Sequence, residues 1–310
     1  MDLYHIPGDT GKPYRRKVVL NLLSGTYIDG ATDYCLLVPY ADEEGLSEEE
    51  RVWLAYLYGL SYSCTTALRM FEVLPSTDKI NMKLFRGFWR AEKNTLWFNP
   101  DKKYIKNNDQ VFPALKSIGR LLEEHNSLRD WVVNRSEKGF HELYRGIQKE
   151  WDFFGPMGAY LFLDALYGLC PSLYVDPDRL DWKGSGKTVV EGMAHMIYKD
   201  ELIESREFPL DKFNRLVDKL QSKTKQPKVI IESTLCAFRK YFKGTRYLGY
   251  YADRLLEECS FVDSLKGVRY KPDVWGLREK TIPEELRGEI HGWGGIRKTR
   301  LKGWLERGEL

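Results

Sequence analysis

From about residue 47 onward, apolar residues recur at intervals of three and four, and this spacing restricts the fold more than any other feature. It places them on one face of an α-helix, which is then buried against another helix. Val111, Leu115, Ile118 and Leu122 show the pattern between residues 109 and 125. Similar patterns predict helices at 62–73, 140–151, 156–167, 189–198, 210–222, 229–242 and 249–258, with a loop at 170–186. The sequence therefore predicts a mainly α fold.

Local signals divide the chain further. Ser47 with Glu50 forms a capping box that starts a helix near residue 48. Upstream, the runs at 17–23 and 33–39 are rich in Val and Leu, which predicts a small β element of short strands. We expect three parts: an N-terminal extension at 1–46, a helical core at 47–265 with a hairpin near 151–168, and a basic C-terminal segment at 266–310.

Composition excludes several classes of protein. Apolar residues make up 43% and charged residues 30% of the 310 residues, which indicates a globular chain. No apolar run approaches the roughly 18 residues of a membrane span, and the first residues do not resemble a signal peptide. The five cysteines form no C-x-x-C pair and the histidines are scattered. We therefore expect reduced thiols in a cytoplasmic protein, with no metal site and no cofactor.

The distribution of charge is more informative than the net value of +3. Residues 210–246 carry ten Lys and Arg against three acids, and residues 287–310 carry six against three. Clustered positive charge of this kind favours a polyanion partner, because neutralised phosphates release their counterions. For 210–228 the alternative is a solvated helix face.

A glycine-rich segment at 184–188 reads Gly-Ser-Gly-Lys-Thr. A P-loop also needs a glycine where this chain has Asp181, and an apolar strand leading into it, so the segment is not a nucleotide-binding P-loop. A looser anion site at a helix start, using Lys187 and Thr188, is one interpretation. An ordinary loop with a threonine cap is the other.

Two further motifs favour nucleic acid. Gly155 and Gly158 lie between two predicted helices, where a tight hairpin can hold a phosphate with its N–H groups, although any turn between helices favours glycine. Such a hairpin is typical of DNA glycosylases, whose catalytic Asp lies about twenty residues later; here Asp176, Asp178 and Asp181 fall in that window. Arg86 and Arg90 alternate with aromatic residues, which suits base stacking and phosphate binding, or else amphipathic packing.

Several blocks of the sequence together resemble the phage amino acid:DNA transferases, also called α-glutamyl/putrescinyl thymine pyrophosphorylases. The resemblance covers most of the chain from about Ser47 onward. The blocks are WLAYLYG at 53–59, FGPMGAYLFLD at 154–164, LDWKGSGKTVVEG at 180–192, IESTLCAFRK at 231–240, RYLGYYADR at 246–254 and GWGGIRK at 292–298.

The resemblance implies a chemistry and a set of partners. These enzymes act on DNA in which a kinase has converted 5-hydroxymethyluracil to its pyrophosphate ester, and they replace the pyrophosphate with an amino acid or polyamine. The family is distantly similar to helix-hairpin-helix DNA glycosylases, which implies a glycosylase-like architecture. It also implies a location in the cytoplasm of an infected bacterium and no membrane partner.

This chemistry selects candidate residues by charge and position. A departing pyrophosphate needs fixed positive charge, an incoming ammonium needs a base, and the target base has to leave the stack. Glu232, within an apolar stretch, is the first candidate for the base. The remaining candidates are Asp181 and Glu191 for catalysis, Arg86, Arg90, Lys187, Thr188, Arg239 and Lys240 for pyrophosphate, and Gly155, Gly158, Lys243, Arg246, Arg297 and Lys298 for DNA.

Two other functions fit the same residues. A DNA glycosylase-like enzyme would use one of the aspartates at 176–181 to cleave the N-glycosidic bond. A non-enzymatic DNA-binding module would use the basic surfaces alone. The sequence does not identify the amine that acts as nucleophile, because pockets for different amines differ by only a few side chains.

Overall fold

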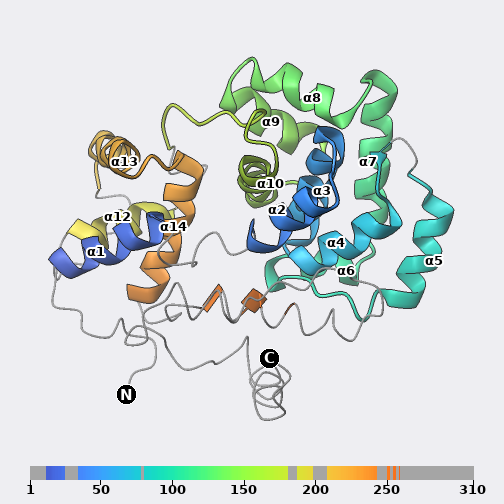
Figure 1. The fold of residues 1–310 in the computed structure, drawn as a ribbon, viewed down its shortest axis with the longest axis horizontal. Helices are drawn as coiled ribbons and strands as arrows, with labels where there is room; N and C mark the ends of the chain where they lie inside the picture. Colours follow the sequence, from blue (N-terminus) through green and yellow to red (C-terminus); the bar gives the residue numbers. More distant parts are fainter. Residues whose placement is uncertain are drawn as a thin grey trace, which may run out of the picture. The chain divides into compact units, whose positions relative to one another are not determined.

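The computed structural model describes residues 12–24, 34–77, 80–180, 187–197 and 208–242, together with positions 250–251, 254–255 and 258. These residues form helices and loops, and no strand occurs among them, which confirms the mainly α prediction (Figure 1). The chain divides into two compact units. Unit 1 comprises Met1–Thr32, Asp178–Glu257 and Asp273–Leu310, and unit 2 comprises Asp33–Pro177 and Glu258–Pro272. The three-part division expected from the sequence stays a prediction.

Unit 2 is organised around α3 (Glu48–Ser61), in which every residue from Val52 to Ser61 is buried. This helix packs against α4, α6, α8 and α10, and α10 in turn packs against α2 and α9 (Figure 1). The other helices of the unit are α2 (Tyr34–Glu43), α4 (Cys64–Val73), α5 (Met82–Glu92), α6 (Lys103–Asn107), α7 (Val111–Glu124), α8 (Leu128–Ser136), α9 (Phe140–Glu150) and α10 (Pro156–Leu169), with a 3-10 turn at Pro100–Lys102.

The predicted capping box at the start of α3 is confirmed. The Glu50 carboxylate accepts a 2.8 Å hydrogen bond from the Ser47 N–H, and the Glu50 N–H donates to the Ser47 hydroxyl oxygen at 3.3 Å. Two backbone donors that the helix leaves without an internal acceptor are thereby satisfied. The helix ends at Tyr62, whose φ of 51° lies in the left-handed region and stops its propagation.

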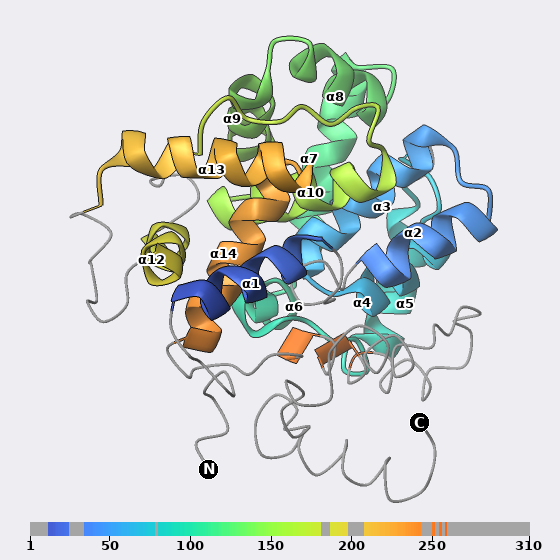
Figure 2. The ribbon, with the colours of Figure 1, turned by 60° about the vertical axis from the view of Figure 1, so that its left-hand side comes forward.

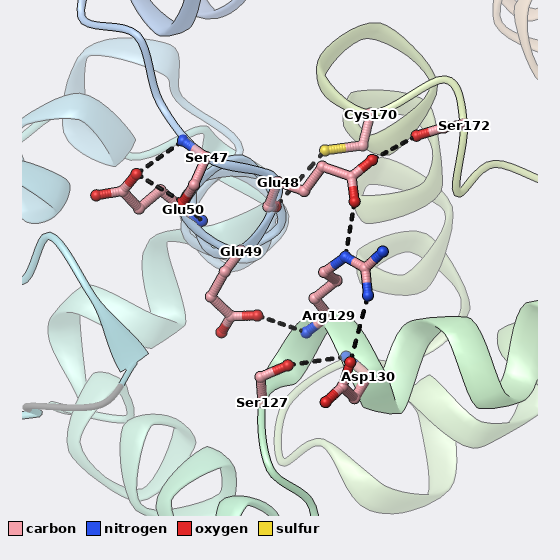
Figure 3. A network of polar contacts seen from close by, with 9 residues as sticks. All are labelled: Ser47, Glu48, Glu49, Glu50, Ser127, Arg129, Asp130, Cys170 and Ser172. Carbon is pink, nitrogen blue, oxygen red and sulfur yellow. Dashed lines mark hydrogen bonds and ion pairs between the residues drawn. The ribbon is translucent and has the colours of Figure 1, made fainter.

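The acidic residues that follow Ser47 fasten α3 to α8 (Figure 3). Glu48 accepts hydrogen bonds from Arg129 Nε at 2.7 Å and from the Ser172 hydroxyl at 2.8 Å. The bond from Arg129 is the main reason that the pKa of Glu48 lies below its usual value. Glu49 accepts from the backbone N–H of Arg129 at 2.7 Å. These two carboxylates stabilise the folded state, because they lie near the N-termini of α3 and α8, where both helix dipoles are positive.

Unit 1 contains α1 (Lys12–Leu23), α12 (Lys187–Ile197), α13 (Leu210–Thr224) and α14 (Lys228–Phe242). The closest pair is α12 and α14; α1 packs against both, and α13 packs against α14 (Figure 2). A buried cation helps to hold α1 in place. Arg15 is 6% exposed, donates to the backbone oxygen of His195 at 3.3 Å, and lies 4.3 Å from the centre of the Phe242 ring.

The predicted N-terminal strands are wrong. Residues 17–23 belong to α1, and residues 34–39 belong to α2. In α1 the buried residues are Val18, Val19, Leu22 and Leu23, which at this spacing form one stripe on a helix. The β-branched residues suggested strands, but packing against α12 and α14 favours the helix.

The other helix predictions that fall within the described residues agree with the structure, and half of the one at 249–258 lies outside them. The predictions at 62–73, 109–125, 156–167, 189–198, 210–222 and 229–242 each match an observed helix to within two residues at either end. The apolar series that starts at Phe140 lies in α9, which ends one residue before Trp151. Among the described helices, none is long and apolar enough to cross a membrane.

Candidate functional site

The α12–α14 seam, defined here as the contact between these two helices in unit 1, contains several predicted site residues. The Thr188 hydroxyl lies 3.4 Å from the sulfur of Cys236, and Glu191 forms an ion pair with Arg239. In both pairs the second residue lies 48 positions after the first. The two pairs lie less than one turn apart on each helix, and Figure 2, which views α12 end-on and α14 from the side, shows that the two helices cross.

A glycine permits the close approach of the two helices. A Cβ atom added to Gly192 would lie 2.1 Å from the backbone oxygen of Leu235 and 2.8 Å from its carbonyl carbon. Such distances leave no room for any side chain. Gly192 therefore brings the backbones of α12 and α14 together, and the neighbouring side chains of Glu191 and Arg239 meet because of it.

The Glu191–Arg239 pair is largely shielded from water. The side chain of Glu191 is 10% exposed and that of Arg239 is 19% exposed, and Arg239 Nε donates to the carboxylate. Desolvating two charges is costly unless they are paired, and removing one partner of such a pair leaves the other buried and uncompensated. The pair fixes the position of a guanidinium inside unit 1, and no described residue accepts a hydrogen bond from its two terminal nitrogens.

Glu232 lies on the same helix as Arg239, seven residues earlier, and this spacing places both on one side of α14. It is 8% exposed. The structure therefore confirms that this carboxylate is buried, as its apolar surroundings in the sequence predicted. Its role as the base stays a prediction.

Lys187 and Thr188 form the first turn of α12, where backbone N–H groups and the helix dipole favour an anion. Lys187 is exposed and Thr188 is half-buried. Lys240 follows Arg239 on α14 and is half-buried. One small unit thus carries six of the candidate residues on its two most closely packed helices: Lys187, Thr188, Glu191, Glu232, Arg239 and Lys240.

Arg86 and Arg90 belong to unit 2. Both lie on α5 and are exposed, and the guanidinium carbon of Arg86 is 5.7 Å from the centre of the Phe112 ring. Lys83 on the same helix is also exposed, and Lys93, which follows its last residue, is half-buried. Their surface position suits contact with phosphate, and their role toward pyrophosphate stays a prediction.

Of the two glycines predicted to form a hairpin between helices, Gly155 lies in the turn and Gly158 lies in the first turn of the second helix. The hairpin joins α9, which ends at Glu150, to α10, which begins at Pro156. Gly155, Pro156 and Met157 are exposed, whereas Gly158 is buried. Phe153 has a φ of 68°, a left-handed conformation that non-glycine residues adopt mainly in tight turns. The tip of the hairpin is therefore accessible, as a backbone-contacting turn requires.

The basic stretch at 210–228 places a row of basic side chains on the surface of α13. Arg215, Lys219 and Lys223 are exposed and recur every four residues along α13, so they form one line on its surface. Lys228 instead is buried and pairs with Asp218 at 3.1 Å. The predicted residues Asp181, Lys243, Arg246, Arg297 and Lys298 lie outside the described residues.

Lys102 and Glu258 are among the buried charged residues that were not predicted as site residues. Lys102, on the 3-10 turn before α6, is 2% exposed. Glu258 is fully buried and accepts hydrogen bonds from the Ser63 hydroxyl and the Cys64 N–H, both at 3.0 Å, at the start of α4. Sequence offers only a weak signal for Lys102, its position among the bases and aromatic residues that follow Arg86, and none for Glu258.

Comparison with known proteins identifies the family. The family model described as amino acid:DNA transferase matches residues 38–247, which include α12, α14 and the hairpin. A serinyltransferase of Salmonella phage ViI is 22% identical, in an alignment that covers 97% of this chain and 82% of the relative. No solved structure matches, so the expected likeness to glycosylases stays a prediction. Because the match to the family model covers more than half of the chain, this protein belongs to the amino acid:DNA transferase family.

Proposed function

We propose that this transferase joins an amine nitrogen to the exocyclic methylene carbon of a modified uracil in DNA and displaces pyrophosphate. The C–N bond forms as the C–O bond to pyrophosphate breaks, the bonding electrons leave with the pyrophosphate, and the attacking ammonium gives up a proton. The observation that carries the proposal is the family match, which spans a seam where carboxylates and bases are held together. The name of the phage relative supports an amino acid as nucleophile.

The proton goes to Glu232 in this proposal. A carboxylate shielded from water and held on a rigid helix suits general base catalysis once substrate lies within hydrogen-bond reach. Glu191 acts on Arg239, because its carboxylate already accepts the Arg239 Nε–H. Asp181 is the second candidate for the base.

In this proposal, positively charged groups on unit 1 bind the pyrophosphate as it leaves. Arg239 is oriented by Glu191, and Lys187 and Thr188 add an ammonium, a hydroxyl and the first N–H groups of α12. Fixed donors of this kind stabilise the charge that develops on a departing pyrophosphate. Lys240, Arg86 and Arg90 are further candidates for pyrophosphate.

DNA would contact the exposed bases and the hairpin. The line formed by Arg215, Lys219 and Lys223 presents repeated positive charge, and Gly155 and Gly158 shape a turn suited to a phosphate. Lys243, Arg246, Arg297 and Lys298 extend the candidate DNA contacts. A kinase that makes the pyrophosphate ester of 5-hydroxymethyluracil in DNA has to supply this substrate.

Product analysis separates this function from the two alternatives. The full-length protein is incubated with DNA that carries the pyrophosphate ester, together with a panel of amino acids and putrescine. Released pyrophosphate and a heavier nucleoside support the transferase, and the mass identifies the amine. Free base with an abasic site would indicate a glycosylase, and a gel shift without any product would indicate a DNA-binding module.

Substitution of the base gives a sharper test of the residues. We expect Glu232→Gln to fold and bind DNA but to lose roughly 10²- to 10⁴-fold in kcat, which is typical for removal of a general base. The exposed Glu142→Gln in unit 2 is the matched control and should turn over as the wild type. If Glu232→Gln keeps the wild-type rate at every pH, Glu232 is not the base, and Asp181 becomes the candidate.

A further inference from the structure

Lys102 is a buried amine without an acceptor among the described residues. It is 2% exposed, and the only described interaction of its amine is with the Phe154 ring, whose centre lies 5.5 Å from Nζ. Burying an ammonium is costly unless an anion or several acceptors compensate for the lost water. Burial accordingly lowers the pKa of Lys102 to about 8. Unit 2 therefore contains a buried amine for which no described residue supplies a hydrogen-bond acceptor.

This amine points at the hairpin. A Cβ atom added to Gly158 would lie 2.9 Å from Lys102 Nζ, so the amine occupies the space beside the first turn of α10 that any other residue would fill. The position of Lys102 therefore explains why residue 158 is a glycine.

The first turn of α10 has unsatisfied donors of its own. Its N-cap is Gly155, which has no side chain to accept from the first N–H groups, and Pro156 has none to donate. The Ala159 N–H makes the first bond, to the Gly155 oxygen at 3.0 Å. No described group accepts from the N–H groups of Met157 and Gly158. These N–H groups form the positive end of the helix dipole, where an anion is favoured.

A further buried donor lies on the turn that carries Lys102. Asn99 is fully buried, and its side-chain oxygen accepts from the Asp101 N–H at 3.1 Å. Its Nδ2 group has no acceptor among the described residues. Buried donors left without partners are rare in folded proteins, and two within four residues, Asn99 and Lys102, indicate a missing ligand that accepts hydrogen bonds.

We propose that Lys102 and the first turn of α10 form a binding site for a phosphoryl group of the DNA substrate. The tip of the hairpin is exposed at Gly155, Pro156 and Met157, which gives a phosphate access from solvent. The site deepens the proposed function and rests on it for the source of the phosphoryl group. That source is either a backbone phosphodiester or the pyrophosphate on the base.

No described charge compensates for the burial of Lys102. The titratable groups on the neighbouring elements are Asp101 beside it in the sequence, Lys103 and Lys106 on α6, and Asp164 on α10. None of these contributes to the lowered pKa of Lys102, whose cause is burial alone. A bound phosphate would therefore be the first close charge that this amine meets, and it would raise the pKa.

Calorimetric titration of the full-length protein tests the site without any turnover. The titrants are inorganic pyrophosphate and a short unmodified DNA duplex. Gly158→Ala is the main variant, because it displaces the flexible end of Lys102 while keeping every charge. Gly119→Ala is the control, since its new methyl group meets nothing within 4 Å in α7. A second pair compares Lys102→Met with Lys103→Met, which removes an exposed charge next to it.

We expect Gly158→Ala and Lys102→Met to weaken binding of one titrant about tenfold or more, the loss typical of a charge-assisted contact, and both controls to bind as the wild type. Loss confined to pyrophosphate assigns the site to the leaving group, and loss confined to the duplex assigns it to the DNA backbone. Unchanged affinity of both variants for both titrants would overturn the proposal.

Proton uptake supplies a readout that needs no variant. At pH 9 most of the free protein has a neutral Lys102, because its pKa is about 8. A bound phosphate would restore the charge, so binding of whichever titrant the variants assign to the site should make the protein take up a proton, measured in buffers of different ionisation enthalpy. No uptake by the wild type would count against the site even if Lys102→Met failed to fold. Affinity losses in a protein that proves inactive as a transferase would keep the site and reject the function.

Discussion

Replacement of Gly192 by alanine should separate the two helices that carry the candidate active site. The added Cβ atom would lie 2.1 Å from the Leu235 oxygen, whereas ordinary contacts begin at 3.4 Å. The gap has to open by about 1.3 Å, the difference between these two distances. The obstructing atoms belong to the backbone, so no change of rotamer can relieve the contact.

The expected cost follows from two opposing effects. Overpacking of a well-packed contact costs about 1–3 kcal/mol and sometimes more, and here α12 loses packing along its length. Alanine in place of a helical glycine returns about 1 kcal/mol through helix propensity. Because the clash is with backbone, we expect the first effect to win by about 2 kcal/mol, which lowers Tm by about 4–8 °C for a unit of this size.

Thermal and urea unfolding of Gly192→Ala, followed by circular dichroism, measure this difference. Gly87→Ala in α5 is the control, because its added methyl group meets nothing within 4 Å, and it should be as stable as the wild type or more so. A Gly192→Ala variant that melts at or above the wild-type temperature would refute the close contact between α12 and α14. The alignment of Glu191 with Arg239 would then need another explanation.

Three further predictions concern unit 2. Ser47→Ala removes the capping box of α3 and should cost about 1 kcal/mol in urea unfolding, and an unchanged midpoint would contradict this. Burial raises the pKa of the Cys170 thiol to about 12, so at pH 8 its labelling by iodoacetamide, followed by peptide mass spectrometry, should be far slower than that of half-buried Cys236; equal rates would contradict this. Because the pKa of Lys102 is lower in the folded protein than its usual value of 10.5, the unfolded state binds more protons between pH 8 and 10.5. The stability of the wild type relative to Lys102→Met should therefore rise across this range, by up to about 3 kcal/mol, and a flat difference in urea unfolding would contradict it.

Features set by neighbouring residues were predictable from the sequence. The capping box at Ser47 and the limits of α7, α10 and α14 depend on local hydrogen bonding and on apolar spacing, and these are visible in a single sequence. The prediction of strands near the N-terminus was wrong because a short run of Val and Leu is compatible with the residue spacing of a strand and with that of a helix. For residues 17–23, the packing of α1 against α12 and α14 favours the helix, and those partners lie more than 150 residues away.

The candidate site depends on contacts that the sequence does not display. Glu191 and Arg239 were both predicted as site residues, but their pairing follows from the approach of α12 to α14 at Gly192. The burial of Lys102 requires the hairpin at Gly158, which lies 56 positions later. Neither glycine differs in its local sequence from an ordinary helical glycine, so only the tertiary structure shows why each is needed.

The most direct test of the proposed reaction follows one oxygen atom. DNA is prepared with ¹⁸O between the exocyclic methylene carbon and the pyrophosphate, and is converted by the enzyme with the amine that the product analysis identifies. Attack at carbon predicts that all of the label leaves in pyrophosphate and none remains in the modified nucleoside. Label retained on the nucleoside would show that a P–O bond breaks instead, and would contradict displacement at the methylene carbon.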